Sequence, residues 1–167
     1  MPARYLETFV IGVVCCFAPV LARAEAVSVP LKKPKQGKAA PYGPAQATGE
    51  PEILTAGDNP QAWTPQQPDG GIEWLLVEFE NVVRIAEIRI RESNNPGAVI
   101  KVVALFDDKE TVVFEGEDPS EAAPTDLIIE PVNDVRTKSV KIFIDTKIKP
   151  GWEQIDAVEL VGKDGSS

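Results

Sequence analysis

The sequence contains no histidine, and its two cysteines, Cys15 and Cys16, stand side by side near the N-terminus. The absence of histidine excludes a Ser-His-Asp triad, a Cys-His pair and the usual zinc sites. Oxygen ligands and carboxylates remain as the only metal or acid–base chemistry. Because both cysteines fall in a segment that we expect to be removed, the folded part is predicted to lack disulfides and to depend on its core alone.

Basic residues are also scarce, with 17 Lys and Arg against 26 Asp and Glu and a formal net charge of −9. Nucleic acids and anionic membrane surfaces are bound through basic patches, so neither is a predicted partner. The exception is Lys32-Lys33-Pro34-Lys35 with Lys38, in a stretch rich in Pro, Gly, Gln and Ala. We interpret residues 25–44 as a flexible basic linker, with contact to envelope polyanions as the alternative.

The N-terminus has the pattern of a secretion signal. Phe9 to Leu21 is an unbroken run of apolar and small residues, preceded by an arginine and followed by Ala22-Arg23-Ala24. The run is shorter than the roughly 20 residues that a transmembrane helix needs. Residues 1–24 are therefore predicted to be a signal peptide, with cleavage after Ala26 as second choice. The mature protein is expected to be secreted, periplasmic or at the cell surface, with no membrane span.

From about Ala45 onward, short runs of Val, Ile, Leu and Phe are separated by Pro, Gly, Asn and Asp. This pattern predicts an all-β sandwich or jelly roll with little helix beyond a turn near residues 55–62. Period-two alternation places Leu75, Val77 and Phe79 on one face of a half-buried strand. The domain is predicted to cover residues 45–163, followed by a disordered tail over 164–167. The expected strands cover residues 73–79, 84–91, 98–106, 111–114, 126–130, 139–146 and 154–161, with a hairpin turn at 107–109.

Four phrases resemble discoidin-like, coagulation-factor C-type domains. They are Gly57 to Trp63, Glu73 to Phe79, Val83 to Ile90 and Ala157 to Gly162, in the order that those domains show. Two further phrases, at 92–99 and 151–156, look like a sub-branch found in exported bacterial proteins. The resemblance implies the galactose-binding-like jelly-roll fold over about 45–162, which also underlies many carbohydrate-binding modules. The two terminal cysteines of the eukaryotic members are missing here.

The resemblance also implies a structural calcium ion, with no other cofactor required. Many relatives hold such an ion between the Asp-containing loop and a glutamate of the last strand, and these positions are Asp58 and Glu159 here. The alternative is that Asp58 caps a turn and Glu159 faces solvent.

The loops contain the candidate ligand contacts. Trp152 follows Lys149-Pro150-Gly151 directly before the last expected strand, where an exposed ring could stack on a sugar or anchor an interface. Trp63, in the first loop, is either a plug under the sandwich or a second ligand contact. Trp74, inside a regular strand, is expected to pack in the core or at an edge.

Polar residues are expected to surround Trp152 if the jelly-roll order holds. Glu92, Asn94 and Asn95 would then converge on it with Asp156, and would offer amide and carboxylate partners to sugar hydroxyls. The alternative is that Asn95-Pro96-Gly97 is only a turn and that Glu92 and Asp156 bind loop amides.

The sequence thus favours an exported, non-catalytic module that binds carbohydrate or a glycosylated surface polymer through loops at one end of the sandwich. The alternative is an envelope protein-interaction or adhesion module, which would use the same loops or a sheet face bearing Leu76 and Phe143. Glu92 and Asp156 form the one carboxylate pair to consider for a glycosidase. No other catalytic motif and no phosphate loop support an enzyme.

Overall fold

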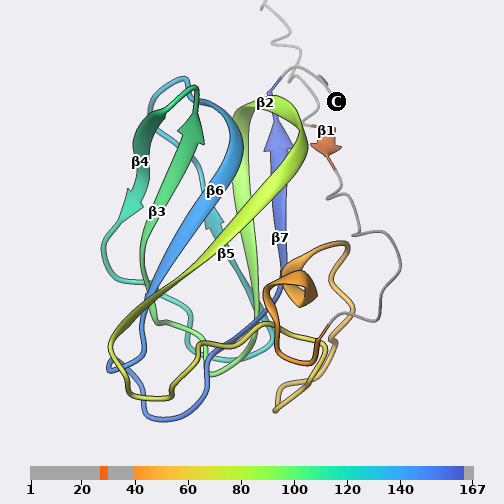
Figure 1. The fold of residues 1–167 in the computed structure, drawn as a ribbon, viewed down its shortest axis with the longest axis vertical. Coiled ribbons are helices and arrows are strands. Elements are labelled where there is room, and N and C mark those ends of the chain that lie inside the picture. The colour runs from red at the N-terminus through yellow and green to blue at the C-terminus, as the bar shows by residue number, and fades with distance from the viewer. Residues whose placement is uncertain (1–26, 30–39, 164–167) are drawn as a thin grey trace, which may run out of the picture.

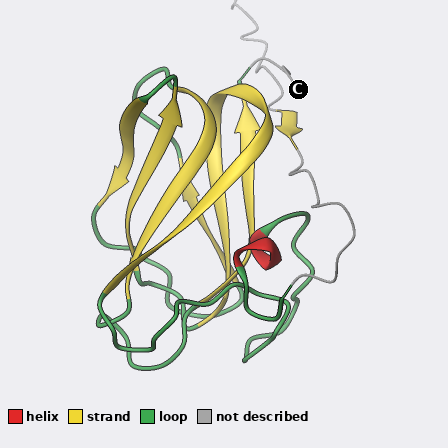
Figure 2. Cartoon of the chain, in the orientation of Figure 1, coloured by secondary structure: helices red, strands yellow, loops and turns green. Residues whose placement is uncertain are grey.

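The computed structural model describes residues 27–29 and 40–163. The predicted signal peptide, most of the predicted linker and the predicted tail lie outside these residues. The described part contains seven strands and one short 3-10 helix (Figures 1 and 2). They are β1 (Val27–Val29), η1 (Pro44–Ala47), β2 (Ile72–Asn94), β3 (Val99–Phe106), β4 (Lys109–Glu115), β5 (Thr125–Ile129), β6 (Arg136–Asp145) and β7 (Gln154–Gly162).

Strand β2 belongs to both layers of the fold. Its first half, residues 72–84, pairs with β6, and its second half pairs with β5 on one side and β7 on the other. Every pairing is antiparallel, and the strand order is β1-β7-β2-β6-β3-β4, with β5 also on β2. The curled sheet therefore forms two packed layers, β1-β7-β2-β5 and β2-β6-β3-β4, and the predicted galactose-binding-like sandwich is confirmed.

The prediction of separate strands over 73–79 and 84–91 is wrong, because β2 runs through both. The register against β6 shifts between Glu78 and Val83, where the strand passes from one layer toward the other. The intervening residues 80–82 contain neither glycine nor proline, so nothing in them ends the extended backbone.

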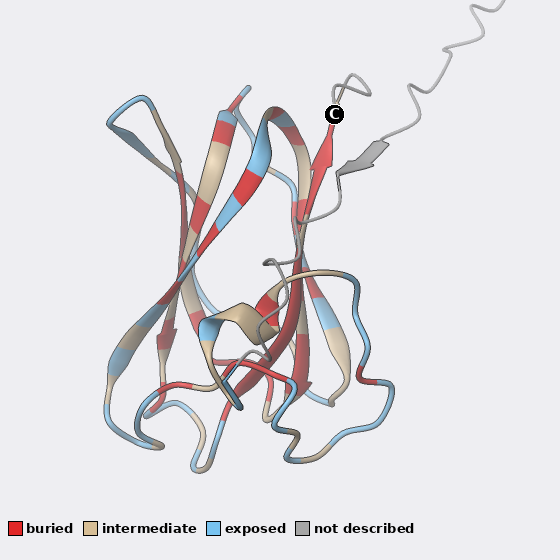
Figure 3. Cartoon of the chain, turned by 45° about the vertical axis from the view of Figure 1, so that its right-hand side comes forward, coloured by how far each residue is buried: buried red, intermediate tan, exposed pale blue. Residues whose placement is uncertain are grey.

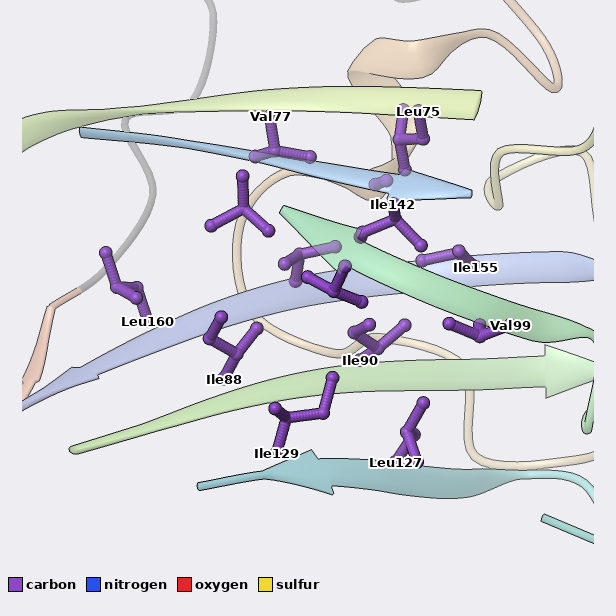
Figure 4. Close-up of a cluster of buried hydrophobic side chains, with 14 of the residues drawn as sticks. Leu75, Val77, Ile88, Ile90, Val99, Leu127, Ile129, Ile142, Ile155 and Leu160 are labelled. Carbon is purple, nitrogen blue, oxygen red and sulfur yellow. The ribbon is translucent and has the colours of Figure 1, made fainter. Parts of the chain in front are cut away.

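The core lies between the two layers and follows the predicted alternation. Buried and exposed positions alternate along the strands in Figure 3, and Figure 4 shows apolar side chains of both layers meeting in the interior. Leu75, Val77 and Phe79 of β2 are each at most 3% exposed, as predicted. Burial of such side chains stabilises the fold by about 1.5–3 kcal/mol each before the entropic cost of ordering them. The other large core residues include Ile85, Ile88, Ile90, Val99, Ile142, Ile144, Ile155 and Leu160.

The predicted hairpin is present between β3 and β4. Asp107 and Asp108 connect the strands with φ angles of 48° and 59°. Two successive residues with positive φ give the tight turn whose twist matches the flanking strands, and aspartate tolerates that conformation better than most side chains.

The N-terminal boundary differs from the prediction. Val27–Val29 pairs with β7, although these residues fall in the predicted linker. Tyr42 is also fixed, because its amide donates to the carbonyl of Pro60 and its carbonyl accepts from the amide of Thr64. Within the described residues, the helical segment is η1, with proline at its start and the fully buried Ala47 at its end. The expected turn is also present, because the amide of Ala62 donates to the carbonyl of Asn59 at 3.1 Å.

We predict that Phe79→Ala lowers the free energy of unfolding by about 3–5 kcal/mol, because Phe79 is 1% exposed and its removal leaves a cavity. The matched control is Val132→Ala at a fully exposed position, which should change stability by less than about 0.5 kcal/mol. Urea unfolding of both variants tests this. Equal midpoints for the two variants would contradict the placement of Phe79.

Candidate functional site

Two adjoining pockets lie at the end of the sandwich that carries the long loops. The larger, of about 660 Å³, is lined by Thr64, Gln66 and Glu73 together with the rings of Tyr42 and Trp74. The smaller, of about 290 Å³, lies between Tyr42, Thr64, Asp58, Trp152 and Gln154. Both pockets are lined by Tyr42 and Thr64, so they adjoin each other, and we call the two together the loop groove.

Three aromatic side chains with exposed surface line the loop groove. Trp74 is 55% exposed and Trp152 is 42% exposed, while Tyr42 is half-buried on the wall that the two pockets share. Trp63 also borders the larger pocket, but it is only 5% exposed and belongs to the core cluster. Trp63 is therefore a floor beneath the groove, and the other three rings are its accessible surface.

Tyr42 is held by both its backbone and its hydroxyl group. Besides its backbone contacts to Pro60 and Thr64, its hydroxyl donates to Oδ2 of Asp58 at 3.2 Å. Desolvation and the Asp58 carboxylate raise the pKa of the Tyr42 hydroxyl. The phenol therefore stays neutral near pH 7 and keeps its donor.

The loop before β7 sets the position of Trp152. The side-chain amide of Asn94 donates to the carbonyl of Trp152 at 2.8 Å, and that of Asn95 donates to the carbonyl of Pro150 at 3.3 Å. Gly151 has a φ of 115°, which favours glycine. The structure thus brings Asn94 and Asn95 to Trp152 as predicted, and their amide groups hold its loop.

Glu92 lies beneath this loop rather than at the surface. It is 4% exposed, and its Oε1 accepts from the amide of Gly97 at 3.1 Å. Burial, together with the negative charge of Asp118, raises the pKa of Glu92 to about 7. Glu92 is therefore placed as in the alternative interpretation, as a partner of the chain's own backbone.

Asp156, on β7, likewise binds backbone amides of the chain itself. It is 3% exposed, and its Oδ2 accepts from the amides of Glu52 and Ile53, both at 2.9 Å. With Glu92 and Asp156 both buried and bound to backbone amides, the pair considered for a glycosidase faces no open cleft.

The two residues expected to hold calcium are not brought together. Asp58 lies beside Gln154 at the start of β7, whereas Glu159 is five residues further along and pairs with Arg89 at 3.2 Å. Five residues of extended strand span about 16 Å. Within the described ranges, 27–29 and 40–163, no group of three or more Asp, Glu, His or Cys side chains is arranged for a metal ion. In this structure Asp58 and Glu159 therefore do not converge on one position.

A side-chain amide makes the connection that was expected of the ion. Nε2 of Gln154 donates to Oδ1 of Asp58 at 2.6 Å, and its Oε1 accepts from the amide of Asn59 at 3.0 Å. Gln154 is 1% exposed, whereas its partner Asp58 lies exposed at the surface. The first loop is thus bound to the closing strand by Gln154 and Asp156.

Glu153 is a buried carboxyl group next to the groove. It is 3% exposed, and among the described residues no other side chain or backbone group bonds to its carboxyl oxygens. Burial, together with the negative charges of Asp69, Asp145 and Glu73, raises the pKa of Glu153 to about 7. Its own carbonyl accepts from the hydroxyl of Thr64 at 2.9 Å, which joins the groove wall to β7.

Sequence reasoning missed two of the groove's aromatic residues. Trp74 was expected to pack in the core or at an edge, but the alternation that buries Leu75 and Val77 also turns Trp74 outward. The alternation of residues in the sequence therefore indicated an outward-facing Trp74. Tyr42 carried no comparable signal, because it was assigned to the linker.

The sequence matches no protein-family model and none of the curated proteins. Its fold is similar to that of the family 32 carbohydrate-binding module of EndoD from Streptococcus pneumoniae, with a TM-score of 0.54 and 10% identity over 84% of this chain and 98% of that one. It is also similar to allantoicase, with a TM-score of 0.51 and 18% identity over 81% of this chain but only 40% of that one. At these identities, the comparisons show a shared fold. Among the described residues, no helix is long and apolar enough to span a membrane.

We predict that the fold loses stability as pH rises through the pKa of Glu153. The folded pKa of about 7 lies above the ordinary value of 4.5, so the contribution of the protonated group is complete below about pH 4.5 and is lost as pH rises through 7. The unfolding free energy of the wild type relative to Glu153→Gln should fall by about 1–3 kcal/mol between about pH 5 and about pH 8. Urea titrations measure this difference, and the exposed Glu121→Gln is the control. A difference that does not change with pH would contradict the burial of Glu153.

We also predict that Gln154→Leu lowers the unfolding free energy by about 1–3 kcal/mol, because it leaves the Asn59 amide and Oδ1 of Asp58 without their hydrogen-bond partner. Calcium and a chelator should leave the melting temperature of the wild type unchanged. A calcium-dependent rise in melting temperature would show instead that an ion contributes to this connection.

Proposed function

We propose that this chain is an exported, non-catalytic module that binds carbohydrate in the loop groove. The observation that carries the proposal is the set of three rings, Tyr42, Trp74 and Trp152, with exposed surface around two adjoining pockets. Each ring comes from a different segment of the chain. Their convergence at the loop end gives an amphipathic surface of the kind on which the apolar face of a pyranose ring can stack.

The groove also supplies polar groups for sugar hydroxyls. Thr64 and Gln66 line the larger pocket, and Asp58 lines the smaller one. The carboxylate of Glu73 accepts from the backbone amides of Gln66 and Gln67 at 2.7 and 3.0 Å, so this part of the wall is fixed before a ligand arrives. Such preorganisation reduces the entropic cost of binding.

Three further observations support the proposal. The fold is shared with a carbohydrate-binding module over nearly the whole of that module. The apolar run near the N-terminus favours export. The carboxyl groups of Glu92 and Asp156 are buried on backbone amides, which favours a binding role over acid–base catalysis.

A second candidate function is an envelope protein-interaction or adhesion module. It is favoured by the outward face of β2, where Leu76 is 48% exposed next to Trp74, and by the half-buried Phe143 on the neighbouring strand. Exposed apolar side chains that gather on one sheet face often mark a contact surface.

The experiment that separates the two is a glycan array with the mature protein, followed by calorimetry on any glycan that binds. We expect a dissociation constant of about millimolar to micromolar, and a loss of about tenfold or more in each of Trp74→Ala and Trp152→Ala, because each substitution removes a stacking surface. The control is Ile128→Ala, which removes a side chain of similar exposure, 54%, outside the groove.

Two outcomes would contradict the carbohydrate proposal. One is the absence of any glycan signal at high protein concentration, together with capture of a specific envelope protein. The other is glycan binding that neither tryptophan substitution weakens while both variants keep the wild-type melting temperature.

A further inference from the structure

The outward face of the β2–β6 pair carries a row of exposed apolar and aromatic side chains. Ile72, Trp74 and Leu76 of β2 are 64%, 55% and 48% exposed. Trp74 lies directly opposite Phe143 of β6, and Leu76 lies opposite Lys141. We call these five residues the outer face.

The ammonium group of Lys141 lies over two aromatic rings of the outer face. Its Nζ lies 4.4 Å from the centroid of the Trp74 ring and 5.0 Å from that of Phe143. An ammonium group over two aromatic rings is attracted by both of them, and it fixes their positions in turn. The cation–π contact with Lys141 therefore holds the ring of Trp74 in place.

The charge of Lys141 has no carboxylate partner among the described residues. Two other lysines of the same layer are paired, Lys101 at 3.2 Å from Glu115 and Lys138 at 3.1 Å from Glu78. An ammonium group without such a partner keeps donors for a charge-assisted hydrogen bond to an anion.

The outer face is continuous with the loop groove. Ile72 and Trp74 belong to the outer face and also line the larger pocket of the groove. A chain-like ligand that leaves the groove across Trp74 therefore reaches Lys141 next.

We propose that the ligand is an acidic oligosaccharide that extends from the loop groove across Trp74 onto the outer face, where its carboxylate or sulfate group binds Lys141. This inference rests on the proposed carbohydrate function and specifies the class of sugar. The formal net charge of −9 repels polyanions in general. The preference for an acidic sugar would therefore come from its short-range contact with Lys141.

The test uses matched pairs of acidic and neutral glycans: sialylated and desialylated, uronate and its methyl ester, sulfated and desulfated. We expect the wild type to favour the acidic member of at least one pair by about tenfold, since hydrogen bonds to charged groups are stronger than those to neutral groups. Lys141→Met should bring this ratio close to one. The wild-type ratio should also decrease as ionic strength rises, whereas the ratio of the variant should not.

The matched control is Lys138→Met, which removes an ion-paired lysine of the same strand and should keep the wild-type ratio. Equal binding of acidic and neutral members, or a preference that survives Lys141→Met, would overturn this inference and leave the proposed function intact. No binding to any glycan would overturn the proposed function and this inference with it.

Analytical ultracentrifugation tests whether the outer face is instead a contact between two copies of the chain. If the wild type self-associates and Trp74→Ala restores the monomer, the outer face is a contact between two copies of the chain, and the acidic-glycan assignment is wrong. A monomeric wild type that prefers acidic glycans supports it.

Discussion

The structure depends on one continuous strand. Strand β2 pairs with β6 along its first half and with β5 and β7 along its second, so both layers are hydrogen-bonded to the same backbone. Its inward side chains, including Phe79 and Ile90, fill the space between the layers. Its two ends serve the site: Trp74 lies near the beginning and Asn94, which holds the Trp152 carbonyl, lies at the end. One strand thus fixes the distance between two walls of the loop groove.

The polar groups around the groove are divided between two tasks. The buried ones, such as Glu92, Gln154 and Asp156, bind backbone amides or side chains of the loops and hold the loops in place without disulfides. The rings of Trp74 and Trp152 keep exposed surface that a ligand can contact. A loop site made in this way is rigid before binding, which favours recognition by stacking on preformed surfaces.

The sequence predicted the fold well because alternation follows burial directly, and Leu75, Val77 and Phe79 of β2 point inward as expected. The sequence carried one sign that β2 is unbroken, because residues 80–82 contain neither glycine nor proline, but the passage of one strand between two layers depends on tertiary pairing. Around the candidate site, it predicted the exposure of Trp152 and the approach of Asn94 to it. It could not distinguish a carboxylate that binds a ligand from one that binds distant amides, as Asp156 does across about a hundred residues. Such pairing depends on tertiary structure.

The most direct test of the account uses the three tryptophans as internal reporters. In a nitrogen-15 NMR titration with the best glycan from the array, the indole N–H signals of Trp74 and Trp152, both exposed in the groove, should shift in proportion to saturation. The signal of Trp63, which is 5% exposed, should move much less. Binding that leaves the signals of Trp74 and Trp152 in place would contradict the assignment of the loop groove as the carbohydrate site.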